Sequence, residues 1–335
     1  MKNGPTILAP ANDDAIAQAA DALANGRLVA LPTETVYGLA ADAGDPTAVA
    51  KIFAIKGRPT FNPLIAHVTD VHAATQLVDL SPDLKQLAAS FWPGPLTLVA
   101  TRRETANISA LATAGLPTLA VRVPAHPVTR RVLQKFAAPL VAPSANRSGR
   151  PSPTTANHVH TDFIDVDELT ILDGGSCDFG LESTIVTDDP NHGVTILRPG
   201  AVTAEQIEKI LGKPVANRLR DAQSVDTKPT APGQLLSHYA PTAHLRLNAT
   251  TLKNGEVLIA FGPPIETQQK TDNPTTIYQL SESASLSEAA ARLFEVLRAL
   301  DRDGRARAAV MPIPNTGLGR AINDRLQRAA APRSS

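Results

Sequence analysis

The segment Leu28–Val68 constrains the fold more than any other part of this chain. It begins with the apolar run Leu28–Leu31, which has the length and composition of a buried strand. Asp45 and Pro46 then predict a helix start, because Asp is a good N-cap and Pro suits the first helical position. A second apolar run, Leu64–Val68, follows. The segment therefore predicts two buried strands with a helix between them.

Polar side chains gather where these predicted elements end. They are Thr33, Glu34 and Thr35 after the first strand, Lys56, Arg58 and Asn62 around the helix end, and His67 within the second strand. Lys56 and Arg58 could be a solvated pair of surface cations. Because Gly57 and Pro59 predict a tight turn around them, we favour a site for an anion such as phosphate over that alternative.

Length and composition limit the kinds of protein this chain can be. Its 335 residues suffice for two domains with separate cores. Its formal net charge of +0 gives no global electrostatic reason to bind nucleic acid and leaves only a local basic patch for that role. The single cysteine, Cys177, rules out an internal disulfide and fits a reducing compartment. The sequence has no cluster of Cys and His residues of the kind that would indicate structural zinc.

The sequence also bears on location. No apolar run has the length of a membrane span. The first residues, MKNGPTILAPANDD, carry acids where a signal peptide needs an apolar core. We therefore expect a cytoplasmic protein.

The chain up to Leu211 alternates short apolar runs with capped helical patterns, which predicts an α/β domain with a parallel or mixed sheet. Expected helices cover Asp13–Ala24, the segment from Ser81 to Trp92, His126–Phe136, and a last helix to Leu211 that a Thr203/Gln206 capping box begins. Expected strands cover Leu96–Ala100, Leu116–Pro124, Leu140–Pro143, Ser183–Val186 and Thr195–Arg198. Trp92 is expected to pack in the core. Ligands of such sheets gather at the carboxyl ends of strands, and the polar motifs fall at strand exits or in adjoining loops.

Two further stretches carry polar groups whose role the residues alone leave open. Arg122 lies inside an apolar run, where a buried cation needs a partner. It either pairs with an acid of the fold or faces the carboxylate of a ligand. The loop Ser144–Ser152 is rich in turn formers, hydroxyls and cations, which suits phosphate, but many surface loops share that composition.

The pattern lapses from about Val215 to Ala243, where neither helix nor strand is indicated. A second α/β unit follows. Its expected strands cover Glu256–Phe261, Thr276–Leu280 and Ala308–Ile313, a Ser285/Glu288 capping box begins one helix, and Leu318–Ala329 forms another. This order predicts a small Rossmann-like domain without a Gly-rich dinucleotide motif. We expect domains at residues 1–214 and 244–335, joined by a linker at 215–243.

Several motifs together resemble one known family. The run PTETVYGL (Pro32–Leu39), the KGRP turn (Lys56–Pro59) and the NPLxxH strand that ends at His67 are similar to the signature of the Sua5/YrdC/YciO family. The loop APSANxSGxPSPT (Ala142–Thr154) and the HYAP motif (His238–Pro241) match it as well. The resemblance covers nearly the whole chain, because the tail resembles the C-terminal domain that Sua5 members add.

The resemblance implies a fold. It is a YrdC-like twisted mixed or parallel sheet with flanking helices, plus a small Rossmann-like α/β C-terminal domain. In Sua5 proteins the linker with HYAP folds back over the active site, whereas the residues alone also allow His238 and Tyr239 to form a loop anchored by one aromatic ring. The family often has basic residues just before HYAP, where this chain has Leu235, Leu236 and Ser237.

The resemblance also implies an activity. Sua5 members are threonylcarbamoyl-AMP synthases, which are nucleotidyltransferases. They make threonylcarbamoyl-AMP and pyrophosphate from L-threonine, bicarbonate or CO2, and ATP. The product passes to the tRNA threonylcarbamoyl-transferase machinery for the t6A modification of tRNA, and weak direct contact with tRNA is conceivable. Mg²⁺ is expected with ATP, held mostly by phosphates and water because no acidic cluster is visible.

The same resemblance assigns residues. Threonine would be held by Thr35, His67, Arg122, Ser183 and Thr184. ATP would be held by Lys56, Arg58, Asn62, Thr118, Ser144, Asn146, Ser152, Arg198, His238 and Tyr239. We expect no covalent catalyst and no metal ligand from the protein, and expect Lys56 and Arg58 to matter most.

Two alternatives remain for the function. One is a tRNA-binding or double-stranded-RNA-binding protein of the YrdC fold without synthase activity. The other is a YciO-like paralogue with the same fold and weak activity, although the intact KGR, SAN and HYAP motifs weigh against it.

Overall fold

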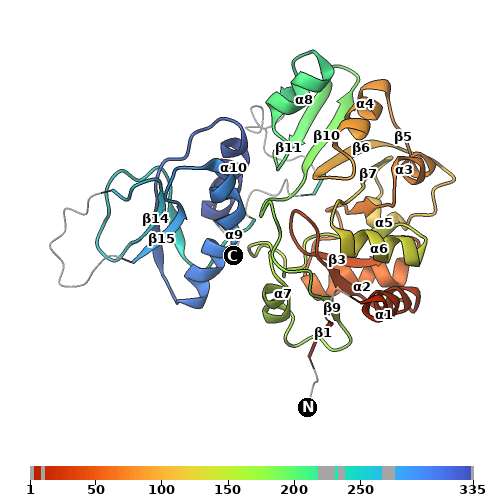
Figure 1. Ribbon diagram of the computed structural model, residues 1–335, viewed down its shortest axis with the longest axis horizontal. Coiled ribbons are helices and arrows are strands. Elements are labelled where there is room, and N and C mark those ends of the chain that lie inside the picture. Colours follow the sequence, from red (N-terminus) through yellow and green to blue (C-terminus); the bar gives the residue numbers. More distant parts are fainter. Residues whose placement is uncertain (1–3, 9–11, 218–230, 233–237, 266–275, 333–335) are drawn as a thin grey trace.

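A computed structural model describes residues 4–8, 12–217, 231–232, 238–265 and 276–332 of the chain. These residues form two lobes that lie side by side (Figure 1). The N-terminal lobe is built on a large sheet with strands up to Asn217, and the C-terminal lobe on a second sheet that begins at His244. Helices α9 (Leu286–Arg302) and α10 (Leu318–Ala330) lie on the side of the C-terminal lobe that faces the N-terminal lobe. None of the helices in these described ranges is long and apolar enough to cross a bilayer.

The N-terminal lobe combines many short strands with helices. Its helices are α1 (Asp13–Ala24), α2 (Pro46–Lys56), α3 (Val71–Leu77), α4 (Pro82–Phe91), α5 (Ala110–Thr113), α6 (Pro127–Phe136), α7 (Ala156–Asp162) and α8 (Ala204–Leu211). Its strands are β1 (Thr6–Leu8), β2 (Val29–Leu31), β3 (Gly38–Asp42), β4 (Ile65–His67), β5 (Val78–Asp79), β6 (Leu96–Arg102), β7 (Thr118–Arg122), β8 (Leu140–Val141), β9 (Thr170–Leu172), β10 (Thr184–Asp189), β11 (Gly193–Arg198) and β12 (Ala216–Asn217).

Helix α2 shows how the sequence sets these boundaries. The Asp45 side chain accepts a hydrogen bond from the backbone N–H of Thr47 at 2.8 Å, and Pro46 occupies the first turn. A cap of this kind stabilises a helix by about 1 kcal/mol. Gly57 ends the helix at φ 60°, a left-handed conformation that favours glycine. The predicted helix start is confirmed, and the end at Lys56 fixes where Arg58 leaves the helix.

The sheet of the N-terminal lobe is mixed, which confirms the predicted α/β class. Its strand order is β1-β9-β2-β3-β8-β4-β7-β6-β10-β11-β12, with β5 paired to β6. β4 pairs with β7 and β6 with β10 in parallel, whereas β10 and β11 are antiparallel. The antiparallel pair brings the N-terminal end of β10 beside Arg198 at the end of β11. Functional groups are therefore not confined to the carboxyl ends of strands.

The two faces of this sheet are covered differently. Ala66 of β4 and Val121 of β7 point into the larger core, which is packed with α2, α4 and α8. On the opposite face, α1 and α6 cover β2, β3 and β8 in a separate small core. Because side chains alternate along a strand, Ile65, His67 and Arg122 belong to that opposite face, beyond the area that α1 and α6 cover. This uncovered part of the sheet is where a ligand site can form.

The C-terminal lobe has a purely parallel sheet, as its Rossmann-like prediction requires. Its strands are β13 (His244–Arg246), β14 (Val257–Phe261), β15 (Ile277–Ser281) and β16 (Arg307–Val310), in the order β13-β16-β14-β15. Its core includes Leu293 and Leu297 of α9, and it also takes in Val36 and Leu181 of the N-terminal lobe together with Tyr239. The core of the C-terminal lobe therefore continues across the junction into the N-terminal lobe.

Most predicted elements are present, and the structure adds several that the sequence did not indicate. The additions are β1, β3, β5, β9, β12, β13, α3, α5 and α7. Most are too short to show a periodic pattern. β3 is longer, but its sequence GLAAD lacks the β-branched residues typical of strands. Trp92 is buried and its Nε1 donates to the carbonyl of Leu96 at 2.7 Å, so its predicted core role is confirmed.

Of the predicted Ser285/Glu288 capping box, only one of the two hydrogen bonds is present. Ser285 caps α9 by accepting the backbone N–H of Glu288 at 3.4 Å, but Glu288 does not return the bond. Its carboxylate accepts from the Ser281 hydroxyl at 2.6 Å, and the same hydroxyl oxygen accepts the backbone N–H of Ser285 at 2.8 Å. The Ser281 hydroxyl thus takes the place of the Glu288 carboxylate as the acceptor for the backbone N–H of Ser285. The other predicted capping box, which begins α8, is complete.

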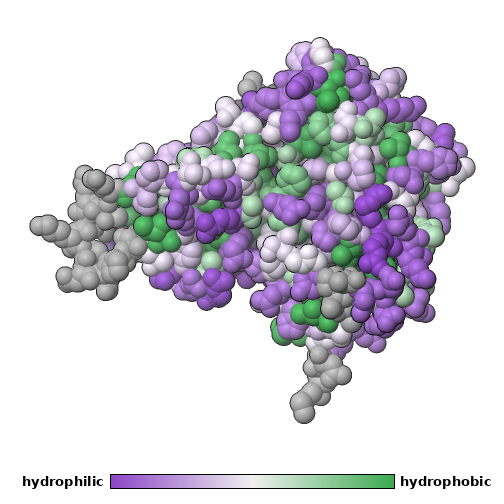
Figure 2. Space-filling model, in the orientation of Figure 1, coloured by the Kyte–Doolittle hydropathy of each residue, from purple (hydrophilic) through white to green (hydrophobic). Residues whose placement is uncertain are grey.

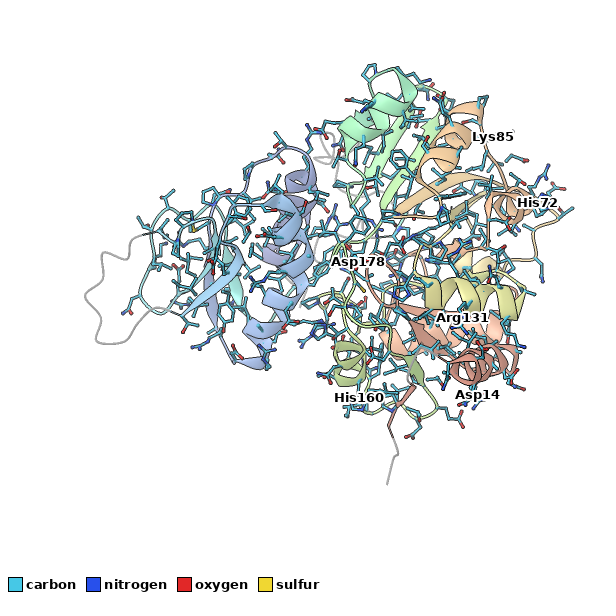
Figure 3. All side chains as sticks on the ribbon, in the orientation of Figure 1. Asp14, His72, Lys85, Arg131, His160 and Asp178 are labelled. Atoms are coloured by element: carbon cyan, nitrogen blue, oxygen red, sulfur yellow. The ribbon has the colours of Figure 1, made fainter. Side chains whose placement is uncertain are left out.

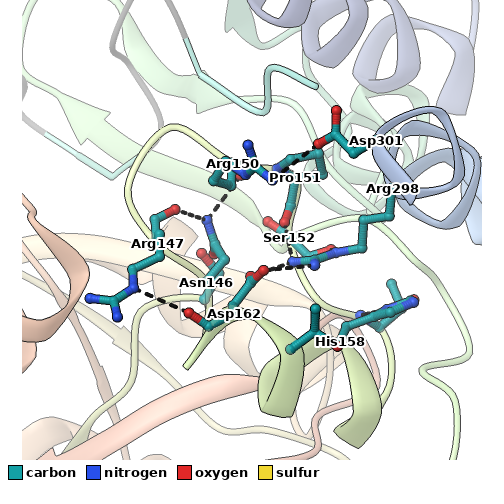
Figure 4. A network of polar contacts seen from close by, with 12 residues as sticks. Asn146, Arg147, Arg150, Pro151, Ser152, His158, Asp162, Arg298 and Asp301 are labelled. Atoms are coloured by element: carbon teal, nitrogen blue, oxygen red, sulfur yellow. Dashed lines mark hydrogen bonds and ion pairs between the residues drawn. The ribbon is translucent and has the colours of Figure 1, made fainter. Parts of the chain in front are cut away.

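Polar contacts also join the lobes. Arg298 of α9 donates to the carbonyl of Pro151 at 2.6 Å and to Asp162 at 2.7 Å, and Arg150 pairs with Asp301 at 3.3 Å (Figure 4). The outer surface is mostly hydrophilic, and hydrophobic residues show where the lobes meet (Figure 2). Side chains fill this junction, where Asp178 lies (Figure 3). Both lobes therefore hold the loop that leads to Ser152.

Candidate active site

A cavity opens on the uncovered part of the N-terminal sheet, beside the C-terminal lobe. About 550 Å³ of empty space lies within it, including the open solvent at its mouth. It is lined by Thr33, Thr35, Val36, Gly38, Arg58, Ile65, His67, Arg122, Ala142, Pro143, Ser144, Glu182, Ser183, Arg198, Pro232, His238 and Tyr239. Residues from distant parts of the sequence thus converge on one space. Most of its polar members were predicted as site residues.

Arg122 stands at one side of the cavity and is paired with an acid. Its guanidinium donates to Glu34 at 2.6 Å, to the Thr35 hydroxyl at 3.0 Å and to the Gly94 carbonyl at 3.2 Å. Burial alone would raise the pKa of Glu34, but the guanidinium holds that pKa below its usual value. Arg122 therefore does both things that the sequence left open: it pairs with an acid and it lines the cavity. We call the group Thr35, His67 and Arg122 the Arg122 side.

The hydrogens of the two threonines at this side can be assigned. The Thr33 hydroxyl donates to the carbonyl of Val36 at 2.6 Å, so at 2.7 Å it accepts from Thr35. The hydrogen of Thr35 is then committed, and one of its lone pairs already accepts from Arg122. What Thr35 can offer a ligand is its remaining lone pair. It is an acceptor for an N–H or O–H group.

His67 is a second acceptor at the Arg122 side. Its Nδ1 lies 3.2 Å from the carbonyl oxygen of Ile65, which can only accept, so Nδ1 carries the hydrogen and Nε2 presents a lone pair. Burial and the nearby Arg122 lower the pKa of His67 to about 3, which keeps the ring neutral near pH 7. A cationic donor beside two acceptors matches an amino acid, whose carboxylate needs donors and whose amine needs acceptors.

The opposite side of the cavity is built around Arg58. We call the lining residues Arg58, Ser144 and His238, together with Asn62 and Asn146, which do not line the cavity, the Arg58 side. Arg58 donates to the backbone carbonyls of Asn62 at 3.2 Å and Pro63 at 2.8 Å, which fixes its guanidinium. Burial lowers its pKa to about 10, so it remains a cation. The alternative of a solvated surface pair is wrong, because Lys56 and Arg58 are both buried.

Lys56 lies behind this side and does not line the cavity. Its ammonium donates to the carbonyls of Ser144 at 2.6 Å and Asn146 at 2.5 Å. Burial, with Arg58 nearby, lowers the pKa of Lys56 well below its usual value. Lys56 therefore ties the loop 144–152 to the end of α2. This contact is what brings the two predicted phosphate motifs together.

Several buried polar atoms at the Arg58 side have no hydrogen-bond partner. Within the described part of the chain, five buried side-chain atoms lack one: Asn62 Nδ2 and Oδ1, Asn146 Oδ1, His238 Nδ1 and Arg102 Nε. Four of the five belong to residues predicted to bind ATP. Leaving such an atom buried without a partner costs about 1–3 kcal/mol, which a polar ligand would recover. Of the three predicted residues that carry these atoms, His238 lines the cavity, whereas Asn62 and Asn146 are not part of its lining.

The floor between the two sides is held by Ser183 and Arg198. Arg198 donates to the Ser183 carbonyl at 2.8 Å and to its hydroxyl at 3.2 Å, and that hydroxyl also lies 2.7 Å from the Thr97 hydroxyl. Both residues line the cavity as predicted. Thr184 does not, since its hydroxyl donates to the carbonyl of Val202 at 2.5 Å.

The described end of the linker forms part of the cavity wall. His238 and Tyr239 both line it, with ring centroids 4.0 Å apart, and the Tyr239 ring packs 5.4 Å from Phe294 of α9. The Ala240 N–H donates to the Gly149 carbonyl at 2.8 Å, which holds this segment on the loop 144–152. The described end of the linker therefore lies over the site. Leu235, Leu236 and Ser237 fall outside the described residues.

Some predicted residues lie elsewhere, and some cavity residues were not predicted. Thr118 begins β7, at the end opposite Arg122, and does not line the cavity. Asn62, Asn146 and Ser152 do not line it either, and the Ser152 hydroxyl donates to Glu182 at 2.6 Å. Glu182 was missed, although it directly precedes Ser183. Thr33 was named in the polar cluster after the first strand but was assigned no role, and Pro232 and the apolar lining carried no separate signal.

Two buried carboxylates, Glu182 of the cavity lining and Glu34 behind Arg122, bear on metal binding. Within the residues that the structure covers, no three His, Cys, Asp or Glu side chains are placed to hold a metal ion together. Glu34 is engaged by Arg122 and by the Ala125 N–H at 3.0 Å, and Glu182 by Ser152 and Arg325. These carboxylates are occupied by donors and do not fit a resident metal.

Comparison with known proteins agrees with this geometry. The family model Sua5_yciO_yrdC, described as "Telomere recombination", matches residues 21–200, and the model described as "Threonylcarbamoyl-AMP synthase, C-terminal domain" matches residues 202–331. The threonylcarbamoyl-AMP synthase of Bacillus subtilis is 39% identical over 96% of this chain and 94% of its own length. The synthase of Pyrococcus abyssi is 37% identical over 93% of each.

A solved structure is similar as well. The crystal structure of P. abyssi Sua5 complexed with L-threonine superposes with a TM-score of 0.84 at 35% identity, covering 98% of this chain and 97% of that one. The similarity thus extends over both lobes and the segment between them. The chain belongs to the Sua5/YrdC/YciO family and carries the C-terminal domain of its threonylcarbamoyl-AMP synthases.

Proposed function

We propose that this protein is an L-threonylcarbamoyladenylate synthase, a nucleotidyltransferase that converts L-threonine, bicarbonate or CO2, and ATP into threonylcarbamoyl-AMP and pyrophosphate. The observation that carries the proposal is the division of one cavity into two chemistries. The Arg122 side offers a cation and two acceptors, as an amino acid requires. The Arg58 side offers a fixed cation and unpaired polar atoms, as a triphosphate requires. The names and folds of the similar proteins support the same activity.

The Arg122 side orients threonine for carbamate formation. The carboxylate binds the free N–H groups of Arg122, and the amine or hydroxyl donates to Thr35 Oγ1 and His67 Nε2. The uncharged amine nitrogen attacks the carbon of CO2, one C=O π bond breaks to leave a negative oxygen, and the nitrogen gives one proton to water, which yields a carbamate. A neutral imidazole and a hydroxyl lone pair favour the uncharged amine that this step needs. Ser183 adds a hydroxyl at the floor. Thr184 does not reach threonine and supports Ser183 through its own bond to the Val202 carbonyl.

The Arg58 side orients ATP for the second step. A carbamate oxygen attacks the α-phosphorus, the bond from that phosphorus to the bridging oxygen breaks, and pyrophosphate leaves. No covalent intermediate with the protein is required, so catalysis rests on positioning and charge neutralisation. Arg58, Ser144 and Arg198 face the phosphates, Asn62 and Asn146 stand beside them, and Lys56 holds the loop that carries Ser144 and Asn146. Mg²⁺ enters with ATP as part of the substrate, held by phosphate oxygens and water.

In the cell, we propose that the product supplies a transferase that attaches the threonylcarbamoyl group to tRNA. The acyl phosphate anhydride in threonylcarbamoyl-AMP is reactive, so a soluble acceptor enzyme in the same compartment must consume it. We place both steps in the cytoplasm.

A pyrophosphate assay tests the proposal. Purified protein with MgATP should release pyrophosphate only when threonine and bicarbonate are both present, and labelled threonine should appear in an adenylate. Serine and an RNA hairpin serve as controls. Binding of RNA without threonine-dependent pyrophosphate release would overturn the proposal in favour of an RNA-binding protein of the same fold.

A further inference from the structure

Arg325 is a fully buried cation that reaches from the C-terminal lobe into the N-terminal lobe. It lies on α10 and is 0% exposed. Its Nε donates to Glu182 at 2.8 Å, and its other nitrogens donate to the Pro199 carbonyl at 2.9 Å and to Asp324 at 2.5 Å. Its guanidinium carbon lies 5.2 Å from the centroid of the Tyr239 ring. One side chain therefore contacts three segments around the cavity.

Glu182 connects this arginine to the cavity. It lines the cavity, and one carboxylate oxygen accepts the Ser152 hydroxyl at 2.6 Å while the other accepts Arg325. Burial alone would raise the pKa of Glu182, but the charges of Arg325 and Arg198 lower it to about 2. The side chain is therefore a carboxylate at neutral pH, inside a site proposed to bind a triphosphate.

The position of Glu182 matters because of its neighbours. His238 lines the cavity with Glu182 and Arg58, and the charges of Glu182, Arg58, Lys56 and Arg325 all act on it. A buried negative charge there repels an anionic ligand unless a cation compensates it. Arg198 already bonds to the backbone and hydroxyl of Ser183. Arg325 is the cation that bonds directly to the carboxylate.

We propose that Arg325 is a positioning residue of the synthase site, supplied by the C-terminal domain, that neutralises Glu182 and holds it against Ser152 so that the Arg58 side accepts the ATP phosphates. The inference rests on the proposed function and adds a role for the second domain. It assigns to Arg325 an effect on ATP and none on threonine. An arginine that merely joined the lobes would not discriminate between the two substrates.

A matched control lies on the same helix. Arg320 also crosses between the lobes and pairs with Glu205 of α8 at 3.0 Å, but it does not line the cavity. Arg325→Met and Arg320→Met therefore both remove one cross-lobe ion pair. Only the first leaves a carboxylate of the cavity without its cation.

The experiment measures KM and calorimetric Kd for MgATP and for threonine in four proteins: wild type, Arg325→Met, Arg320→Met, and the double variant Arg325→Met/Glu182→Gln. We expect Arg325→Met to raise both ATP constants at least tenfold and to change those for threonine less than twofold. Arg320→Met should stay within twofold of wild type. The double variant should regain most of the lost ATP affinity, because the unpaired charge is gone.

Two results would overturn the inference: equal losses for ATP and threonine in Arg325→Met, or a double variant as weak for ATP as the single one. If Arg325→Met does not fold by circular dichroism, Arg325→Lys replaces it, with a predicted three- to tenfold loss for ATP alone and no loss as the contradicting result. The proposed function is judged separately. If the wild type released no pyrophosphate, that function would fail, while ATP calorimetry would still test Arg325.

Discussion

The two sides of the cavity differ in how their polar groups are satisfied. On the Arg122 side, one lobe supplies every member, and Arg122, Thr33 and Thr35 already form a connected set of hydrogen bonds. On the Arg58 side, Asn62, Asn146 and His238 keep buried atoms without partners among the described residues. That side also depends on contacts from the second lobe.

The difference teaches how one fold binds two unlike substrates. A side whose bonds are complete holds its shape before the ligand arrives, so it costs little to order on binding. A side with unpaired atoms gains stability only with the ligand in place. We infer that the Arg122 side is preformed for threonine and that ATP completes the Arg58 side. Four predictions test this contrast.

The largest expected effect is that of Arg58→Ala on turnover. Removing a fixed cation from the phosphates should lower kcat/KM about 10³-fold, in line with the loss of one electrostatic contact to a developing charge. Threonine binding should change less than twofold, and the melting temperature by a few degrees. Arg103→Ala, which removes an exposed arginine paired with Asp79, is the control and should keep full activity. Wild-type turnover in Arg58→Ala would refute the phosphate assignment.

Removing Mg²⁺ should separate the two sides without any mutation. Excess EDTA should reduce pyrophosphate release about 100-fold. In such reactions the ion stabilises the phosphate charge of the transition state by several kcal/mol. The calorimetric Kd for threonine should not change, and added Mg²⁺ should restore turnover. Full turnover in EDTA, or loss of threonine binding, would show that the ion does not act with ATP alone.

Thr35→Val tests the Arg122 side with a side chain of the same shape. It removes one acceptor for threonine and one partner of Arg122, a loss of about 1–2 kcal/mol, so KM for threonine should rise about tenfold. KM for ATP should stay within twofold. Thr187→Val, which removes a hydroxyl on β10 bonded to the Val99 carbonyl, is the matched control. Equal rises for both substrates would contradict the division into two sides.

The last prediction concerns the stability of the protein in mild acid and not its turnover. Burial lowers the pKa of His67 and of His238 to about 3, whereas an unfolded histidine titrates near 6.5. Below about pH 6.5 the unfolded state binds more protons, so stability is complete above that pH and declines as the pH falls toward 3, by about 1 kcal/mol per pH unit for each histidine. Carboxylates with lowered pKa values, such as Glu182, lose their contribution only below about pH 4.5.

The measurement is urea unfolding at pH 7, 6 and 5, followed by the fluorescence of Trp92. His67→Gln should flatten the pH dependence by about 1 kcal/mol per pH unit. His238→Gln should do the same on the other side of the cavity. An unchanged slope in both variants would mean that neither imidazole is held neutral in the folded protein.

Much of the fold was predictable because its boundaries carry local chemistry. Asp45, Ser81 and Thr203 cap the helices that they were predicted to begin. The short strands β1 and β9 were missed because three residues carry no recognisable period. Their pairing depends on contacts between residues far apart in the chain, which a local pattern does not encode.

The site was predictable where residues stand in motifs and not where they act across lobes. Arg122 looked ambiguous in sequence because its acid, Glu34, lies 88 positions away. Glu182 stood next to predicted residues but lacked a known partner. Arg325 did leave one signal, a cation next to the apolar positions Ile322 and Leu326 of α10. Its target in the other lobe appears only in three dimensions.

A crystal structure with threonine and a non-hydrolysable ATP analogue tests the central claim most directly. The account predicts the threonine carboxylate within hydrogen-bond distance of Arg122 and the amine near Thr35 and His67. It predicts phosphate oxygens at Arg58, with partners for the polar atoms of Asn62 and Asn146. Phosphates bound at Arg122, or bound outside the cavity with Asn62 still unpaired, would contradict it.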